Sequence, residues 1–285
     1  MKVKTPLDIL KERNKIKRRK PGLLSLLQDV NEERRRQEQQ DRLLDFYRHP
    51  LRTKHGTLII GVKCKDGIII GSDRKVDRGG ETEYSNKVFE LDLGGPVLFA
   101  AEGLTGIRDD FFLLLETEVQ RRKGVDSLYE VKVIVEDIIA NLTERYAERV
   151  RDPSPIGVLM AGLRNLTKGM ATLYYIHAPG YGEEVSFMCS GHGGPYAYPL
   201  AKFLFDPSIQ TSICLDEASK RVAFVISWVG GDVDSTVGGL PQVMTLKTDN
   251  LKTETMSDEA IKAMSTMMTD KRSRLPEVLG LTLVA

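Results

Sequence analysis

Short apolar runs separated by turn residues fill the first part of the chain after residue 56. The turn residues are Asp66-Gly67 and Gly94-Gly95, a composition typical of chain reversals between strands. The pattern therefore predicts strands with a hairpin at Asp66-Gly67. The runs, rich in Ile, Val and Leu, lie at 57–64, 67–73, 86–92 and 96–102.

Two helical stretches follow at 107–123 and 127–150, separated by Gly124. Ser127 and Glu130 have the spacing of a capping box, which marks a helix start. Apolar residues then recur at helical spacing and predict one face that packs on a sheet. They are Val131, Ile134, Val135, Ile138, Ile139, Leu142 and Tyr146.

The second half of the chain again alternates predicted strands with predicted helices. Strands, a helix pair, strands, a second helix pair and strands are typical of an α+β domain, in which sheets pack together and helices cover the outer faces. Strands are predicted at 155–163, 171–178 and 184–188, helices from Pro195 and over 215–229, a hairpin within 242–254 and a helix at 257–272.

Residues 1–56 differ in composition from the remainder. They hold 16 Lys/Arg and 8 Asp/Glu, which leaves 25 and 32 in residues 57–285, although the whole chain has a net charge of only +1. This first segment, which includes the very polar stretch at 31–42, resembles an exposed helix with little stability of its own, because its apolar residues form two small clusters. The opposite charges suggest that this leader lies against the body or another acidic partner.

Several classes of protein are excluded by composition. The apolar runs are shorter than the roughly 20 residues of a membrane-spanning helix, and the mixed-charge N-terminus lacks the features of a secretory signal. We therefore expect a cytoplasmic protein with no membrane partner. Cys64, Cys189 and Cys214 are too scattered for a disulfide framework or a zinc site, so no metal or cofactor is expected.

Three polar residues stand at the ends of predicted strands: Thr57, Asp73 and Lys87. The hairpin would place the start of its first strand beside the end of its second, and so Thr57 beside Asp73. A lysine entering a sheet interior requires a carboxylate partner, for which Asp73 is the candidate. The alternative is that these residues are unrelated and solvated.

Six segments occur in an order that resembles proteasome β subunits, which are N-terminal-nucleophile threonine peptidases. The likeness extends from residue 57 to about residue 250, and "GHGGPYA" within it also resembles the bacterial HslV peptidase. The segments are "GTLIIGVKCKDGIIIGSDRKV" (56–76), "NKVFELD" (86–92), "AEGLTG" (101–106), "SGHGGPYAYPLAKF" (190–203), "LDEASKRVAFVI" (215–226) and "DSTVGG" (234–239).

The resemblance implies a four-layer α-β-β-α sandwich, the N-terminal-nucleophile hydrolase fold. Residues 1–56 would be a basic, partly helical propeptide, and 57–285 the peptidase domain. The chain would be made as a zymogen and cleave itself between Gly56 and Thr57. Glycine suits that position because, without Cβ, it permits a strained backbone near the nucleophile.

The resemblance also assigns catalytic roles. Thr57 would be the nucleophile, with its own freed α-amine as the base. Lys87 would help to keep that amine neutral, and Asp73 would hold Lys87 by a charge-assisted hydrogen bond. The N–H of Gly103 would stabilise the oxyanion. Asp234 would support the nucleophile from a loop, or would simply end a helix.

Four positions depart from the family pattern, and one of them is Leu58, which follows the nucleophile where a second threonine is common. His192 and Gly194 stand where the family commonly has serines, and Val237 replaces a hydroxyl residue. His192 would either replace the serine as a hydrogen-bond partner, adding a titration near pH ~6.5, or merely be tolerated in a Gly-rich turn. The competing interpretation is a non-catalytic β-type ring subunit retained for assembly.

The family also implies the substrate and the partners. Val76, Ala101 and Thr105 match the primary specificity pocket, whose small or apolar walls predict an apolar substrate side chain. The partners would be proteasome α subunits, other β subunits in a ring and an ATP-dependent unfoldase, with unfolded polypeptide degraded inside the chamber. The basic "KIKRRK" at 15–20 has a rival interpretation as a nucleic-acid arm, but a propeptide explains the same residues, so no nucleic-acid partner is expected.

Overall fold

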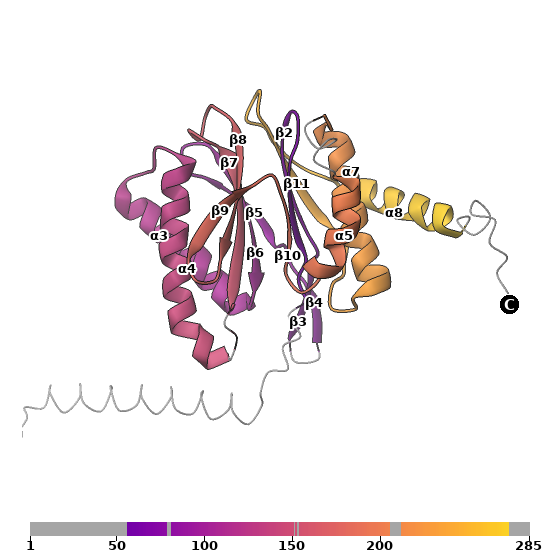
Figure 1. The fold of residues 1–285 in the computed structure, drawn as a ribbon, viewed down its shortest axis with the longest axis horizontal. Coiled ribbons are helices and arrows are strands. Elements are labelled where there is room, and N and C mark those ends of the chain that lie inside the picture. The colour runs from indigo at the N-terminus through magenta and orange to yellow at the C-terminus, as the bar shows by residue number, and fades with distance from the viewer. Residues whose placement is uncertain (1–55, 79–80, 151, 153, 206–211, 274–285) are drawn as a thin grey trace, which may run out of the picture. The chain divides into compact units, whose positions relative to one another are not determined.

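Two five-stranded antiparallel sheets form the centre of the molecule (Figure 1). The computed structural model describes residues 56–78, 81–150, 152, 154–205 and 212–273, so the helix predicted for the first segment lies outside the described residues. One sheet has the strand order β10-β1-β2-β11-β12 and the other β5-β6-β7-β8-β9, with a separate pair β3-β4.

The strands follow the apolar runs closely. β7 is buried at all eight positions, as expected for a strand covered on both faces. The strand bounds are β1 Ile59–Lys63, β2 Gly67–Ser72, β3 Lys75–Arg78, β4 Glu81–Tyr84, β5 Val88–Asp92, β6 Pro96–Gly103, β7 Ile156–Leu163, β8 Ala171–His177, β9 Tyr181–Val185, β10 Phe187–Ser190, β11 Gln242–Lys247 and β12 Thr253–Thr255.

Helices cover the outer face of each sheet. Figure 1 shows α3 and α4 beside the β5–β9 sheet, and α5 and α7 beside the sheet that contains β1 and β2. The helix bounds are α3 Thr105–Arg122, α4 Leu128–Val150, α5 Gly194–Leu204, α7 Leu215–Trp228 and α8 Asp258–Ser273, with a π-helical turn η1 at Val229–Val233.

Three buried apolar clusters hold these elements together. Ile59 and Ile70 of one sheet share a cluster with Leu98 and Leu159 of the other, so the two sheets pack face to face. A second cluster joins the β5–β9 sheet to α3 and α4, and a third joins the β1–β2 sheet to α5 and α7. The predicted mixture of sheets and helices is confirmed.

The predicted strand at 184–188 is wrong in extent. This stretch splits into β9, which pairs with β8, and β10, which pairs with β1 of the other sheet. The chain thus crosses from one sheet to the other at Ser186, where no apolar pattern marks a break. Strands β3 and β4 were not predicted, because β4 is exposed at every position and carries no apolar alternation.

The predicted start of α4 is close to the observed one. The Ser127 Oγ accepts a hydrogen bond from Glu130 N at 3.2 Å, as in a capping box. The Glu130 carboxylate accepts instead from Asp126 N, at 3.0 Å. Within the described ranges, none of the helices is both long enough and apolar enough to cross a membrane.

Candidate active site

Thr57 and Asp73 lie beside each other at one end of the β1–β2 pair. The register pairs Ile59 with Ser72, which places Leu58 opposite Asp73. Asp73 N donates to Leu58 O at 3.1 Å, and Leu58 N donates to the Asp73 Oδ1 at 3.0 Å. The hairpin therefore brings the two predicted residues together, as the sequence indicated.

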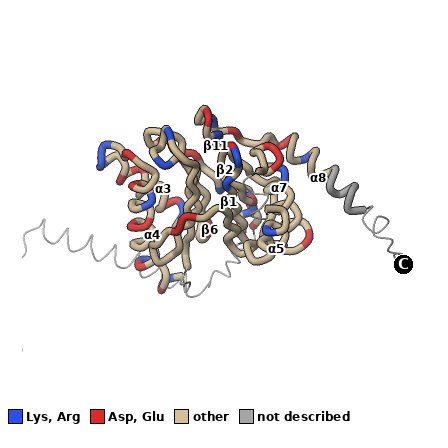
Figure 2. Tube along the Cα trace, turned by 45° about the horizontal axis from the view of Figure 1, so that its top comes forward, with Lys and Arg blue, Asp and Glu red and all other residues tan. Residues whose placement is uncertain are grey.

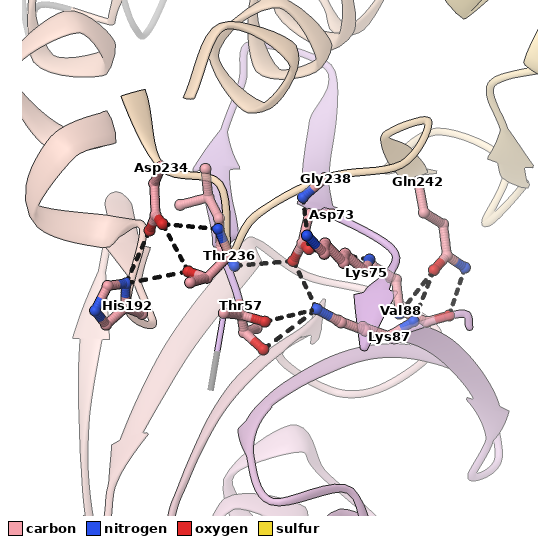
Figure 3. Close-up of polar contacts among 12 residues, drawn as sticks. Thr57, Asp73, Lys75, Lys87, Val88, His192, Asp234, Thr236, Gly238 and Gln242 are labelled. Atoms are coloured by element: carbon pink, nitrogen blue, oxygen red, sulfur yellow. Dashed lines mark hydrogen bonds and ion pairs between the residues drawn. The ribbon is translucent and has the colours of Figure 1, made fainter. Parts of the chain in front are cut away.

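Lys87 reaches this position from the other sheet, just before β5. Its Nζ donates to the Asp73 Oδ1 at 2.7 Å, the Thr57 Oγ1 at 3.2 Å and the Gly56 O at 3.3 Å (Figure 3). Thr57, Asp73 and Lys87 are exposed by 6%, 0% and 2%. One buried ammonium thus contacts a hydroxyl and the carbonyl of the preceding peptide bond.

The Asp73 carboxylate is held by four donors. Leu58 N and Lys87 Nζ donate to its Oδ1, while Lys75 N and Gly238 N donate to its Oδ2 at 3.1 and 3.2 Å. Burial raises the pKa of Asp73 and lowers that of Lys87, and the ion pair between them opposes both shifts. The carboxylate is therefore fixed in position and directs the ammonium toward Thr57.

Gln242 fixes the backbone of Lys87, a role that the sequence did not reveal. Its Oε1 accepts from Lys87 N at 2.9 Å and Val88 N at 3.0 Å, and its Nε2 donates to Val88 O at 2.7 Å. No sequence signal pointed to this role, because the burial of Gln242 is visible only in the structure.

A second polar group lies on the other side of Thr57. The His192 Nδ1 is 2.8 Å from the Asp234 Oδ2, and the Thr236 Oγ1 donates to the Asp234 Oδ1 at 2.7 Å (Figure 3). Burial alone would raise the pKa of Asp234, but hydrogen bonds from Thr236 and His192 lower it. The structure thus joins His192 to Asp234, and Thr236 is a further member that sequence reasoning missed.

This second group borders the peptide bond before Thr57. A Cβ built on Gly56 would lie 1.7 Å from Thr236 O, so only glycine fits there. Among the described residues, no hydrogen bond joins Asp234 or His192 directly to Thr57. Their connection to Thr57 passes through the packing of Thr236 on Gly56.

The turn that carries His192 also contacts the backbone of Thr57. Gly193 N donates to Thr57 O at 3.1 Å. Gly191 has φ +88°, and a Cβ there would lie 2.2 Å from Thr57 O, so the turn requires glycine for both its conformation and its close approach.

The half-buried carboxyl of Glu102 supports this turn through Ser190. The Glu102 Oε1 accepts from the Tyr175 OH at 2.6 Å and the Ser190 Oγ at 2.8 Å. Burial raises the pKa of Glu102, and these two hydrogen bonds only partly oppose that effect. The cluster ties the end of β6 to Ser190, the residue before the glycine turn.

The remaining predicted residues lie in β3, in β6 and at the start of α3. Gly103 ends β6 with φ +109°, and no hydrogen bond joins it to Thr57 in the part of the chain that the structure describes. Val76 and Ala101 are buried, and Thr105 begins α3. Their proposed roles stay predictions. No cluster of three or more His, Cys, Asp or Glu within the described ranges is arranged to hold a metal ion.

Comparison with known families identifies the chain. The family described as "Proteasome subunit" matches residues 53–229, which is more than half of the chain. The chain belongs to the proteasome subunit family. The resemblance to proteasome β subunits seen in the sequence motifs is thereby confirmed.

Relatives within the proteasome family are distant. A proteasome subunit beta of Nanoarchaeum equitans is 26% identical over 64% of this chain and 89% of its own length. Proteasome subunit beta 1 of Streptomyces avermitilis is 24% identical over 80% of this chain and 81% of its own length. A proteasome subunit beta of Jonesia denitrificans is 22% identical over 65% of this chain but only 60% of its own length.

Solved structures with a similar fold include Anbu proteins. Anbu, described as an ancestral β-subunit, from Yersinia bercovieri has a TM-score of 0.62 at 15% identity, over 80% of this chain and 99% of that one. Anbu from Hyphomicrobium sp. strain MC1 has a TM-score of 0.61 at 14% identity, over 76% of this chain and 95% of that one. At these identities the likeness shows the fold alone.

Proposed function

We propose that this chain is a proteasome-type β subunit with threonine endopeptidase activity. Residues 1–56 would be a propeptide, and the body would adopt the four-layer sandwich of N-terminal-nucleophile hydrolases. The observation that carries the proposal is the position of the Lys87 Nζ, 3.2 Å from the Thr57 Oγ1 and 3.3 Å from the Gly56 O. A structural lysine would require neither contact.

Self-cleavage would begin with attack of the Thr57 Oγ on the carbonyl carbon of Gly56. The Lys87 ammonium lies where it would stabilise the negative charge that develops on the Gly56 oxygen. Collapse of the intermediate breaks the Gly56–Thr57 amide, whose nitrogen takes up the proton lost by the Thr57 Oγ and becomes the α-amine, and it leaves an ester between Gly56 and the Thr57 Oγ. Water then hydrolyses this ester, releasing the leader and freeing both the hydroxyl and the α-amine.

Peptide hydrolysis would use the new amine as its base. An α-amine has a reference pKa of about 7.7–8.0, which suits proton transfer near neutral pH. The buried charge of Lys87 would disfavour a second positive charge nearby. Thr57 would form an ester with the substrate carbonyl carbon, the amine would return its proton to the leaving nitrogen, and water would release the product. Gly103 N–H would stabilise the oxyanion.

His192 would act near that amine. The Thr57 nitrogen is bonded to Gly56, which packs against Thr236 in the group formed with His192 and Asp234. This supports His192 as the counterpart of the family serine, with Asp234 holding its ring. His192 would then position the amine.

The wider assignment follows from family membership. We propose assembly into rings with other β subunits and with α subunits, and a supply of unfolded polypeptide by an ATP-dependent unfoldase. The enclosed chamber would provide selectivity. The compartment would be the cytoplasm, with neither nucleic acid nor membrane as a partner.

A non-catalytic ring subunit is the second candidate, and it is favoured by Val237. The Val237 side chain packs so closely that a Cβ on Gly193 would lie 2.7 Å from its Cγ2. An apolar side chain therefore fills space beside the His192 turn where the family places a hydroxyl.

Intact mass and peptidase assays of the assembled complex separate these candidates. The enzyme should contain subunits that begin at Thr57, whereas Thr57→Ala should keep residues 1–56 and lose turnover. Thr167→Ala, at an exposed turn, is the matched control and should behave as wild type. Retention of the leader by assembled wild type would favour the non-catalytic subunit, and equal turnover by wild type and Thr57→Ala would exclude Thr57 as nucleophile.

A further inference from the structure

Arg108 is a buried cation that the proposed mechanism does not use. It is the fourth residue of α3 and is 9% exposed. Its Nε is buried without a hydrogen-bond partner. Within the described ranges, its carboxylate contact is Asp109 at 3.4 Å, whose side chain is 65% exposed. A buried guanidinium is costly unless its charge and N–H groups are paired.

Arg108 lies beside the predicted specificity pocket. Its Cζ is 5.8 Å from the ring centroid of Phe89, two residues after Lys87. Thr105 lies one helical turn before Arg108 and so on the same face of α3. Ala101 belongs to the buried cluster between its strand and this helix. The guanidinium therefore lies beside Phe89, on the face of α3 that also carries Thr105 of the predicted pocket.

Charge balance in this region favours an anionic ligand. Burial lowers the pKa of Lys87, and the positive charge of Arg108 lowers it further. Asp73 is already bonded to Lys87, so it does not neutralise Arg108. The Arg108 guanidinium thus adds a buried positive charge beside Phe89, and its Nε lacks a hydrogen-bond partner.

We infer that the pocket beside Thr57 receives a carboxylate side chain, so that cleavage occurs preferentially after Glu or Asp. The guanidinium would form charge-assisted hydrogen bonds with that carboxylate. Phe89 and Ala101 would contact its methylene groups. The sequence-based expectation of an apolar side chain considered only Val76, Ala101 and Thr105 and omitted Arg108. This inference rests on the proposed peptidase function.

A panel of fluorogenic peptides that differ only at the residue before the cleaved bond tests the inference on the assembled complex. With Glu, Gln, Leu and Arg at that position, kcat/KM should be highest for Glu, by about 10-fold or more over Gln. Arg108→Met should reduce the ratio of kcat/KM for the Glu peptide to kcat/KM for the Leu peptide by about 10- to 100-fold, because only the Glu side chain loses a charged partner. Arg108→Lys should restore part of the loss.

Arg121→Met removes the same charge from the exposed end of α3 and is the matched control, expected to keep the Glu preference. Equal cleavage after Glu and Gln by wild type would overturn the inference. This comparison uses wild type alone, so it tests the inference even if Arg108→Met fails to assemble. Cleavage after Leu that depends on Thr57 but shows no preference for Glu would refute the carboxylate-binding pocket and leave the proposed peptidase function standing. Cleavage of no peptide, by wild type or Thr57→Ala, would refute the proposed function and this inference with it.

Discussion

Gly191 combines two requirements in one residue, a left-handed backbone and the absence of a side chain. Its φ is +88°, and the nearest atom to a Cβ there is the carbonyl oxygen of Thr57. An alanine would therefore push directly against the backbone of the proposed nucleophile.

Gly191→Ala should stop or strongly slow removal of the leader, by about 10-fold or more for a displacement costing at least 1.4 kcal/mol. Gly169→Ala is the matched control, since Gly169 also has a positive φ of +101° but its nearest Cβ contact is 3.5 Å away. The control should lose about 1–2 kcal/mol of stability and still process normally. The rate is followed by intact mass, and wild-type processing of Gly191→Ala would contradict the site geometry.

Burial lowers the pKa of Lys87, and the nearby charge of Arg108 lowers it further. Because burial and Arg108 both lower the Lys87 pKa from its ordinary 10.5, Lys87 should lose its proton, and activity should fall, at a pH below that value. Arg108→Met removes one cause, so the Lys87 pKa should rise and the alkaline limit should move to higher pH. The pH profile of kcat/KM for a Leu peptide measures this shift. An alkaline limit that stays unchanged or falls in Arg108→Met would contradict an effect of the Arg108 charge on Lys87.

At the scale of elements, α3 packs on its sheet through a few fully buried residues. Leu115 is 0% exposed within the cluster that joins α3 and α4 to β6 and β7, whereas Leu113 is 65% exposed. These two leucines allow a test of the packing with identical chemistry.

Leu115→Ala should lower the free energy of unfolding by about 2–5 kcal/mol, because it leaves a cavity in a packed core. Leu113→Ala should change it by about 0.5 kcal/mol or less. Urea unfolding of the unassembled subunit measures both. Similar losses in the two variants would mean that α3 packs through a different face.

The sequence predicted those elements whose burial produces a regular apolar pattern. The β7 run and the apolar face of α4 are examples, because each is set by local spacing. The sequence did not reveal β4, which is exposed throughout, or the separation of β9 from β10. These depend on which sheet the chain joins, and no local pattern records that choice.

The candidate site likewise contains some residues that the sequence could place together and others that it could not. Thr57 and Asp73 could be placed together because one hairpin fixes their register. Arg108, Gln242 and Thr236 could not be placed, because each reaches the site from an element distant in sequence. The sequence also held no sign that Arg108 and Gln242 are buried. Only the folded chain associates Gln242 with Lys87 and Thr236 with Gly56.

At the scale of the whole molecule, charge is divided between leader and body. In the body, acidic and basic residues are interspersed along α3 and α4 (Figure 2). Residues 57–285 hold 25 basic and 32 acidic residues, whereas the complete chain has 41 and 40. Removal of the leader would change a nearly neutral chain into an acidic one.

This difference predicts a chromatographic shift on processing. At pH 8, wild type should elute from an anion-exchange column at higher salt than Thr57→Ala, which keeps the basic leader. Thr57→Ser, which preserves a hydroxyl nucleophile, should elute with wild type once processed. Coelution of wild type and Thr57→Ala would show that the leader stays on both.

Gly56 sits between Thr57 and the Thr236 carbonyl with no room for even a methyl group. The same space must admit any foreign polypeptide that Thr57 is to cut. A newly made subunit would therefore be blocked by its own chain and harmless to its surroundings, and the timing of one intramolecular reaction would decide when it becomes destructive.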